Sequence, residues 1–198
     1  KAVYRGHEMI TEYIDSTHQY FIEGKGVPSV TTILKAAGLY NENFFTEASR
    51  TRGTYVHKAI LYYLQDDLVE ETIPDEYRGY IEAFKRFMAE ADCKPHLEMC
   101  EVPLFSEVWR FGGTPDIPCV FNGAESIIDV KSGAKSDTTG VQLAAYALLH
   151  PIPSVKRYGL YLKANGKYRL IPYLDRNDTK IFNSALSLYH WRAERNLL

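Results

Sequence analysis

The stretch from Phe111 to His150 constrains the fold most, because it combines two short apolar runs, a tight turn and a helical segment. Asn122-Gly123 is the strongest two-residue hairpin signal, since both residues tolerate a positive φ. Ile117–Phe121 and Ile127–Lys131 flank this turn and are predicted to be two antiparallel strands. Pro118 indicates that the first strand lies at a sheet edge or contains a bulge.

Polar residues occur in this stretch where a core would require apolar ones. Asp129 and Lys131 end the second strand and share one face, because side chains alternate along a strand. An aspartate and a lysine two residues apart can be a solvated ion pair, which contributes little to stability. Asp116 favours a functional interpretation, since it would come level with Asp129 across the hairpin, and two adjacent carboxylates repel unless a cation lies between them.

Paired carboxylates of this kind suit Mg²⁺ or Mn²⁺, which bind one or two carboxylates together with substrate phosphate. A lysine beside them can orient and help deprotonate an attacking water, or offset charge on the phosphate in the transition state. The pattern therefore predicts metal-assisted phosphodiester hydrolysis. Gln142 and Tyr146, four residues apart, share one face of the following helix. Packing alone could explain Tyr146, but it explains Gln142 less easily.

Three ordered motifs in this stretch resemble the PD-(D/E)xK nuclease superfamily, and within it the RecB-type exonuclease branch. They are Gly113-Thr-Pro-Asp116, Asp129-Val-Lys131 and Gln142-Leu-Ala-Ala-Tyr146. The resemblance implies an α/β (α+β) fold with a restriction-endonuclease-like core, in which helices flank a mixed central sheet, and Mg²⁺-dependent cleavage of DNA. It also implies that Asp116, Asp129 and the Val130 carbonyl bind the metal and that Lys131 positions the attacking water. Gln142 and Tyr146 would hold the scissile strand or orient the lysine.

A long helix is predicted over Phe44–Gln65, and it contains Gly53 and His57. Gly53 costs about 1 kcal/mol relative to alanine, which indicates a helix break or the close approach of another backbone. A lone helical histidine is more often a satisfied structural group than a ligand, but Gly53–His57 resembles a GxxxH motif of RecB-type nucleases and implies that His57 lies near the metal. Relatives often carry a metal-proximal glutamate on the strand before the aspartate, for which Glu101 is the candidate and Glu98 the weaker one. A solvent-facing strand glutamate is the alternative.

Candidate phosphate contacts are basic side chains near these motifs, although a solvated helix face explains those on the helix equally well. The nucleic-acid contacts are Arg50, Arg52, Lys58 and Lys135, with Gln142 and Tyr146. The net charge of −2 gives no global basic surface, so DNA binding would depend on a local groove. The three cysteines have no CxxC spacing and indicate a reducing compartment. They cannot supply the four ligands of the iron–sulfur cluster found in some RecB-type relatives, so no cluster is predicted.

The remaining elements complete one predicted nuclease domain over residues 1–198, with an N-terminal hairpin and a helical elaboration. The hairpin covers residues 11–22 with its turn at 23–26, and His18 and Tyr20 are predicted to be surface residues. Helices are predicted over 30–37, 74–91 and 175–195, and strands within 97–110 and over 155–163 and 168–174. Asn165-Gly166 would join the last two strands by the same turn type as Asn122-Gly123.

The predicted function is a Mg²⁺-dependent (or Mn²⁺-dependent) exonuclease acting on DNA ends. The alternatives are a structure- or sequence-specific endonuclease on the same core, a catalytically inactive nucleic-acid-binding module, and a metal hydrolase that is not a nuclease. Because no apolar run is long enough to span a membrane, no membrane partner is expected, and the expected location is the cytoplasm of a bacterium or of a phage-infected host. The phrase VPSVTTIL, at residues 27–34, also resembles phage-encoded nucleases of this branch.

Overall fold

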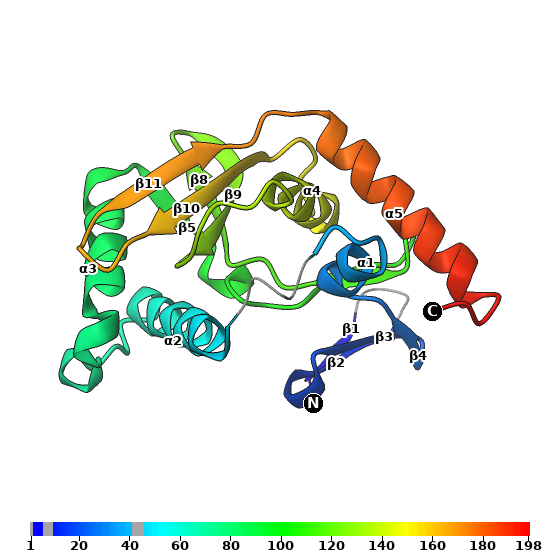
Figure 1. Ribbon diagram of the computed structural model, residues 1–198, viewed down its shortest axis with the longest axis horizontal. Helices are drawn as coiled ribbons and strands as arrows, with labels where there is room; N and C mark the ends of the chain where they lie inside the picture. Colours follow the sequence, from blue (N-terminus) through cyan, green and yellow to red (C-terminus); the bar gives the residue numbers. More distant parts are fainter. Residues whose placement is uncertain (1, 6–9, 41–45) are drawn as a thin grey trace.

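A five-stranded mixed sheet in the order β11-β10-β9-β8-β5 forms the centre of the fold (Figure 1). The structure is a computed structural model that describes residues 2–5, 10–40 and 46–198. The sheet consists of β5 (Cys93–Pro95), β8 (Ile117–Phe121), β9 (Ala124–Lys131), β10 (Lys156–Leu162) and β11 (Tyr168–Pro172). Strands β9 and β10 are parallel, whereas the other neighbouring pairs are antiparallel.

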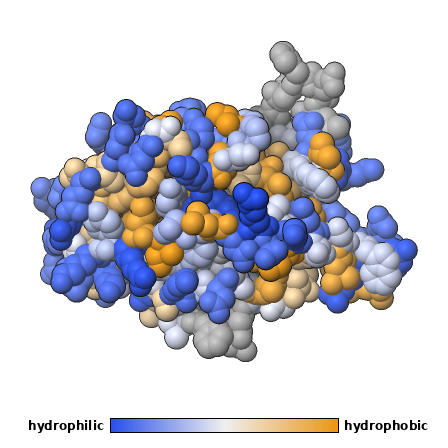
Figure 2. All heavy atoms as spheres, turned by 90° about the horizontal axis from the view of Figure 1, so that it is seen from above, coloured by the Kyte–Doolittle hydropathy of each residue, from blue (hydrophilic) through white to orange (hydrophobic). Residues whose placement is uncertain are grey.

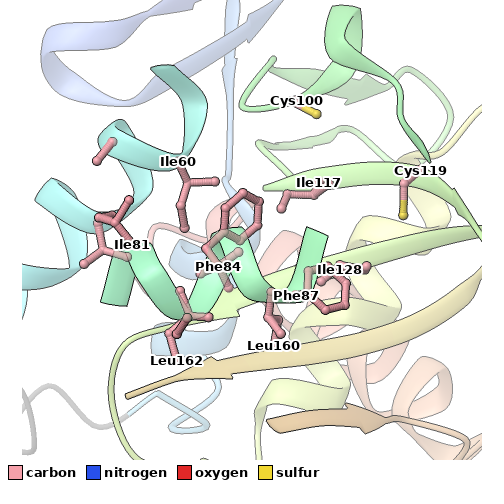
Figure 3. Close-up of a cluster of buried hydrophobic side chains, with 14 of the residues drawn as sticks. Ile60, Ile81, Phe84, Phe87, Cys100, Ile117, Cys119, Ile128, Leu160 and Leu162 are labelled. Carbon is pink, nitrogen blue, oxygen red and sulfur yellow. The ribbon is translucent and has the colours of Figure 1, made fainter. Parts of the chain in front are cut away.

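Helices cover both faces of this sheet, which confirms the predicted mixed central sheet flanked by helices (Figure 1). They are α1 (Val30–Ala36), α2 (Glu47–Leu64), α3 (Asp75–Glu90), α4 (Thr139–Leu149) and α5 (Asn177–Ala193), with short 3-10 turns η1 (Asp15–Thr17), η3 (Glu70–Thr72) and η4 (Leu97–Met99). Ile128 and Val130 of β9 pack into an apolar cluster with α2 and α3, part of which Figure 3 shows. Ile127, on the opposite face, packs into a second cluster with α1, α4 and α5.

The N-terminal region forms a four-stranded antiparallel sheet rather than a single hairpin. Its strands are β1 (Ala2–Arg5), β2 (Ile10–Ile14), β3 (Gln19–Ile22) and β4 (Lys25–Val27). The predicted turn at 23–26 is shorter than expected, because Lys25 and Gly26 already pair with β3. A separate two-stranded ribbon, β6 (Leu104–Ser106) and β7 (Phe111–Gly113), accounts for part of the strand region predicted over 97–110.

The structure corrects the prediction made from Pro118. Strand β8 lies second from the sheet edge, between β9 and β5, and contains no bulge in its register with β9. Proline is accommodated because β5 pairs only with residues 119–121, so the ladder on that side ends before Pro118. The carbonyl of Pro118 still accepts a hydrogen bond from the His96 N–H, at 2.8 Å.

The two predicted hairpin turns differ. Asn122 and Gly123 both have positive φ, 48° and 72°, as the two-residue turn requires. In the β10–β11 connection, of Asn165 and Gly166 only Gly166 has a positive φ, 75°, so the prediction of the same turn type was wrong. The connection is longer than two residues: the Lys163 N–H donates to the Lys167 carbonyl at 2.9 Å, and the Gly166 N–H donates to the Lys163 carbonyl at 3.2 Å. The Ala164 carbonyl lies against α3, where a Cβ on Gly79 would be only 1.7 Å from its oxygen.

Helix α2 runs without interruption through Gly53, and outside the helix's own backbone no atom of the described residues lies within 4 Å of where a Cβ on Gly53 would be. Both explanations offered for this glycine, a break and a close backbone, were therefore wrong. Residues 44 and 45 of the predicted helix lie outside the described residues. No helix within the described part of the chain is both long and apolar enough to cross a membrane. Figure 2 shows one face of the molecule, where hydrophobic side chains are interspersed among hydrophilic ones.

Candidate metal and phosphodiesterase site

The β8–β9 hairpin brings the two predicted carboxylates together. Its register pairs Ile117 with Ile128, so Asp116 lies one step further along, level with Asp129. The Val130 N–H donates to Asp116 Oδ2 at 2.6 Å, which fixes the Asp116 carboxylate against β9. Both aspartates are buried, with 8% of Asp116 and 1% of Asp129 exposed.

Lys131 joins this pair to helix α4. Its ammonium lies 2.7 Å from Asp129 Oδ2, an ion pair whose alignment does not meet the geometry of a hydrogen bond. Lys131 Nζ donates to Gln142 Oε1 at 3.1 Å, and Gln142 Nε2 donates to the Tyr146 hydroxyl, also at 3.1 Å. The predicted motif residues thus form one continuous polar chain from β9 to α4.

Close packing around the Gly112-Gly113 pair positions this chain. A Cβ on Gly112 would lie 2.2 Å from the Tyr20 ring, and a Cβ on Gly113 would lie 3.0 Å from the Tyr146 ring. The Tyr20 hydroxyl bonds Thr114 Oγ1 at 2.7 Å, so an N-terminal strand supports the segment that leads into Asp116. Tyr20 is buried, which corrects its prediction as a surface residue.

Helix α2 places His57 against the aspartates. Its Nδ1 lies 3.0 Å from Glu101 Oε1 and 3.5 Å from Asp116 Oδ1, and its Nε2 lies 3.0 Å from the Val130 carbonyl oxygen. Since a carbonyl only accepts hydrogen bonds, Nε2 carries a proton. Both ring nitrogens therefore face oxygen acceptors.

Glu101 reaches the site from a loop and not from the strand that was predicted. It follows η4 and has a φ of +53°. Its N–H lies within hydrogen-bond distance of the carbonyl oxygens of Pro115 and Asp116, at 3.1 and 3.3 Å, which holds the loop beside β8. Glu98, the weaker candidate, lies in η4 and is exposed.

The electrostatics follow from burying several carboxylates together. Burial and the neighbouring Asp116 raise the pKa of Glu101, and burial raises the pKa of Asp129 to about 6 despite the ion pair with Lys131. Burial acts to raise the pKa of Asp116, but His57, Lys131 and the Val130 N–H together outweigh it, so the pKa lies below its ordinary value. Conversely, burial lowers the pKa of His57, and the carboxylates of Asp116 and Glu101 raise it well above 6.5. Lys131 likewise has a raised pKa, because Asp129 and Asp116 outweigh its burial.

His57, Glu101 and Asp116 form a group that could hold a metal ion, with one ligand atom from each lying within 4.8 Å of the others. Two carboxylates and an imidazole fit Mg²⁺ or Mn²⁺ in ligand type. A small cavity of about 10 Å³ adjoins the group, roughly enough for one water. Asp129 adjoins this group, because it lies level with Asp116 across the hairpin and forms an ion pair with Lys131.

The predicted phosphate contacts are not all gathered here. Arg52 Nε lies 3.5 Å from Ser132 Oγ just beyond β9, and its guanidinium lies over the Tyr80 ring. Lys58 and Lys135 lie over the rings of Tyr62 and Tyr173. These three side chains thus have aromatic neighbours of their own. Arg50 is exposed on the first turns of α2.

Comparison with known proteins does not assign this chain to a family. Neither a protein-family model nor a curated protein matches the chain. Several solved structures match, among them the crystal structure of a provisionally named exonuclease from Eubacterium rectale. That match has 12% identity and a TM-score of 0.48, and it covers 88% of this chain and 77% of the other. At this identity and TM-score the match establishes neither a family nor an activity for this chain.

Proposed function

We propose that this chain is a metal-dependent deoxyribonuclease, and specifically an exonuclease that hydrolyses phosphodiester bonds at DNA ends with Mg²⁺ or Mn²⁺. One observation carries the proposal: ligand atoms of His57, Glu101 and Asp116 lie within 4.8 Å of one another, beside the ion pair between the buried Asp129 and the half-buried Lys131. The exonuclease assignment and the PD-(D/E)xK, RecB-type relationship rest on the resemblance of the three motifs.

The acidic group would hold the metal. Asp116, Glu101 and His57 supply the ligand atoms, and Asp129 and the Val130 carbonyl are further candidates beside them. The chemistry that a bound divalent ion supplies is activation of water and neutralisation of phosphate charge. A raised pKa keeps Lys131 protonated at neutral pH. This favours a role for Lys131 in stabilising negative charge on the scissile phosphate over a role as a general base.

Gln142 would hold Lys131 in place. Its Oε1 accepts from the lysine ammonium while its Nε2 donates to Tyr146, so the amide orientation is fixed from both ends. Tyr146 is buried, and burial raises its pKa well above 10, which keeps its hydroxyl neutral. Gln142 and Tyr146 thus position the Lys131 ammonium without adding a charge of their own. Lys135 and the arginines of α2 are the proposed contacts to flanking phosphates.

The test is nuclease activity on end-labelled linear DNA and on a closed circle, each with Mg²⁺, Mn²⁺ or EDTA. Metal-dependent loss of the end label with the circle intact is expected. Lys131→Ala should lower kcat by about 10²–10³-fold, as the loss of one charge-stabilising donor does. Lys156→Ala, an exposed lysine at the start of β10, is the matched control.

Each other outcome has a meaning. Cutting of the circle would replace the exonuclease by an endonuclease on the same residues. Full activity in folded Asp116→Ala and Asp129→Ala variants would remove the proposed site. DNA binding without any cleavage would favour the alternative of a catalytically inactive nucleic-acid-binding module.

A further inference from the structure

A second hollow lies away from the metal site, on the other side of Tyr20. It is a groove of about 750 Å³ between β3, β4, the start of α1 and the last turns of α5. These elements lie together at one end of the molecule in Figure 1. Neither the predicted site residues nor the proposed catalytic group uses this groove.

The groove combines cationic and aromatic side chains. Lys25 and Arg110 line it, and Glu194 is the one carboxylate among those lining residues that the structure describes. Phe21 and Tyr189, both half-buried, contribute aromatic rings. Two cations against one carboxylate give the described lining a small positive charge, whereas the whole chain has a net charge of −2.

Several groups in the groove are held in position and keep unused hydrogen-bonding capacity. The Arg110 guanidinium donates through one Nη to the Ile22 carbonyl at 3.4 Å, while the planar fork still has other N–H groups. His190 Nε2 donates to the Trp109 carbonyl at 3.1 Å, and His18 uses Nδ1 with the Tyr13 hydroxyl at 2.6 Å. Among the residues that the structure describes, the second nitrogen of each imidazole has no hydrogen-bond partner.

Two exposed tryptophans are sequence neighbours of residues that line the groove. Trp109 precedes Arg110 and Trp191 follows His190, and they are 47% and 49% exposed. Exposed tryptophans are enriched at binding surfaces, because the large ring contributes contact area at low conformational cost. These are the two tryptophans of the chain.

The groove is connected to the candidate active site through one side chain. Tyr20 lines the groove, and its hydroxyl bonds Thr114, two residues before Asp116. A polymer bound along the groove would therefore lead towards the segment that carries the first catalytic carboxylate.

We infer that this groove binds a single strand of nucleic acid, independent of sequence, and guides it to or from the site. Cations that follow a phosphate backbone, interleaved with aromatic rings on which bases stack, are the recognition chemistry of single strands. The inference deepens the proposed nuclease function and rests on it for the direction of the strand. Binding itself requires no hydrolysis, so the two proposals can fail separately.

The test is binding of a single-stranded oligothymidylate of about 12 nucleotides, within the usual site sizes, in EDTA to prevent cleavage. Tryptophan fluorescence should change on binding, because each tryptophan is the sequence neighbour of a residue that lines the groove. Phe21→Ala should weaken binding at least about fivefold, the lower end of one stacking contact. Lys25→Ala should reduce the slope of log K against log salt by about 0.7, the contribution of one phosphate contact to a single strand.

Lys163→Ala is the matched control for Lys25→Ala, since Lys163 is exposed on the β10–β11 turn, at the other end of the molecule in Figure 1. It should bind like the wild type. Absence of a fluorescence change in the wild type, or unchanged affinity in both groove variants while they stay folded, would overturn the inference. Equal affinity for a blunt duplex of the same length, with the same losses in the variants, would also overturn its single-strand part. If the wild type binds the strand, the groove variants bind it less well and no DNA is cleaved under any condition, the groove proposal would hold and the nuclease proposal would fail.

Discussion

Gly53 gives a prediction whose sign and size follow from the structure. It lies inside α2, and apart from the helix's own backbone the described part of the chain has no atom within 4 Å of an added Cβ. Alanine there removes the conformational entropy cost of glycine without a clash, so Gly53→Ala should raise the free energy of unfolding by about 0.5–1 kcal/mol. For a chain of this length, 1 kcal/mol corresponds to roughly 2–4 °C in Tm.

Gly79 in α3 is the matched counterpart. The same substitution there would put a Cβ 1.7 Å from the Ala164 carbonyl oxygen, so the backbone of the β10–β11 turn would have to move. Its overpacking cost of about 1–3 kcal/mol should outweigh the helix-propensity gain, and Gly79→Ala should lower the Tm. Thermal unfolding in EDTA, followed by circular dichroism, measures both variants.

The refuting result is equally specific. A Gly53→Ala variant destabilised as much as Gly79→Ala would mean that something fills the space beside Gly53 in the folded protein. Gly53 and His57 are four residues apart and share one face of α2, so that filled space would adjoin the metal site.

Three further predictions concern buried charge. Mg²⁺ or Mn²⁺ at about 100 times its Kd should stabilise the fold by about 2.7 kcal/mol, and Asp116→Ala should abolish this gain in thermal shift. Burial raises the pKa of Asp129 to about 6, so the folded protein keeps this proton up to a higher pH than the unfolded chain does. The free energy of unfolding should therefore fall by at most about 3 kcal/mol as the pH rises from about 4 to 6. The free energy of unfolding of Asp129→Asn, measured in EDTA, should therefore rise relative to that of the wild type over this pH range. An equal pH dependence of the two proteins would refute this. Asp178→Ala should lower the free energy of unfolding in urea by about 3 kcal/mol, because it leaves the largely buried Arg157 side chain without the carboxylate that lies 3.0 Å from it. A loss under about 1 kcal/mol would contradict that reasoning.

Local sequence signals predicted the hairpin and helix of the motif region because each signal acts within a few residues. Asn122-Gly123 determines its own turn, and the turn sets the register that brings Asp116 level with Asp129. The spacing of Gln142 and Tyr146 placed both on one face of α4, where they do contact each other. These relations require no knowledge of the rest of the chain.

Other features depend on tertiary contacts that no local pattern encodes. Glu101 reaches His57 from an irregular loop, because its N–H lies against the carbonyls that precede β8, and a strand assignment could not foresee that. Tyr20 was predicted to be a surface residue on a hairpin, but Gly112 leaves room for its ring to pack. The glycine pair at 112 and 113 was the available signal, since two adjacent small residues permit such an approach.

The arrangement of charge explains how a bound cation would stabilise this cluster. Asp116, Glu101 and Asp129 lie close together and largely out of water, and burial alone would favour their neutral forms. His57 partly compensates, since both of its nitrogens face oxygen acceptors and its pKa is raised well above 6.5. An imidazolium carries a single charge, and the pKa values of Glu101 and Asp129 stay raised beside it. A fold that retains buried carboxylates at such a cost departs from the rules of stable packing at the place where function is expected. A divalent cation is the ligand that would remove that cost.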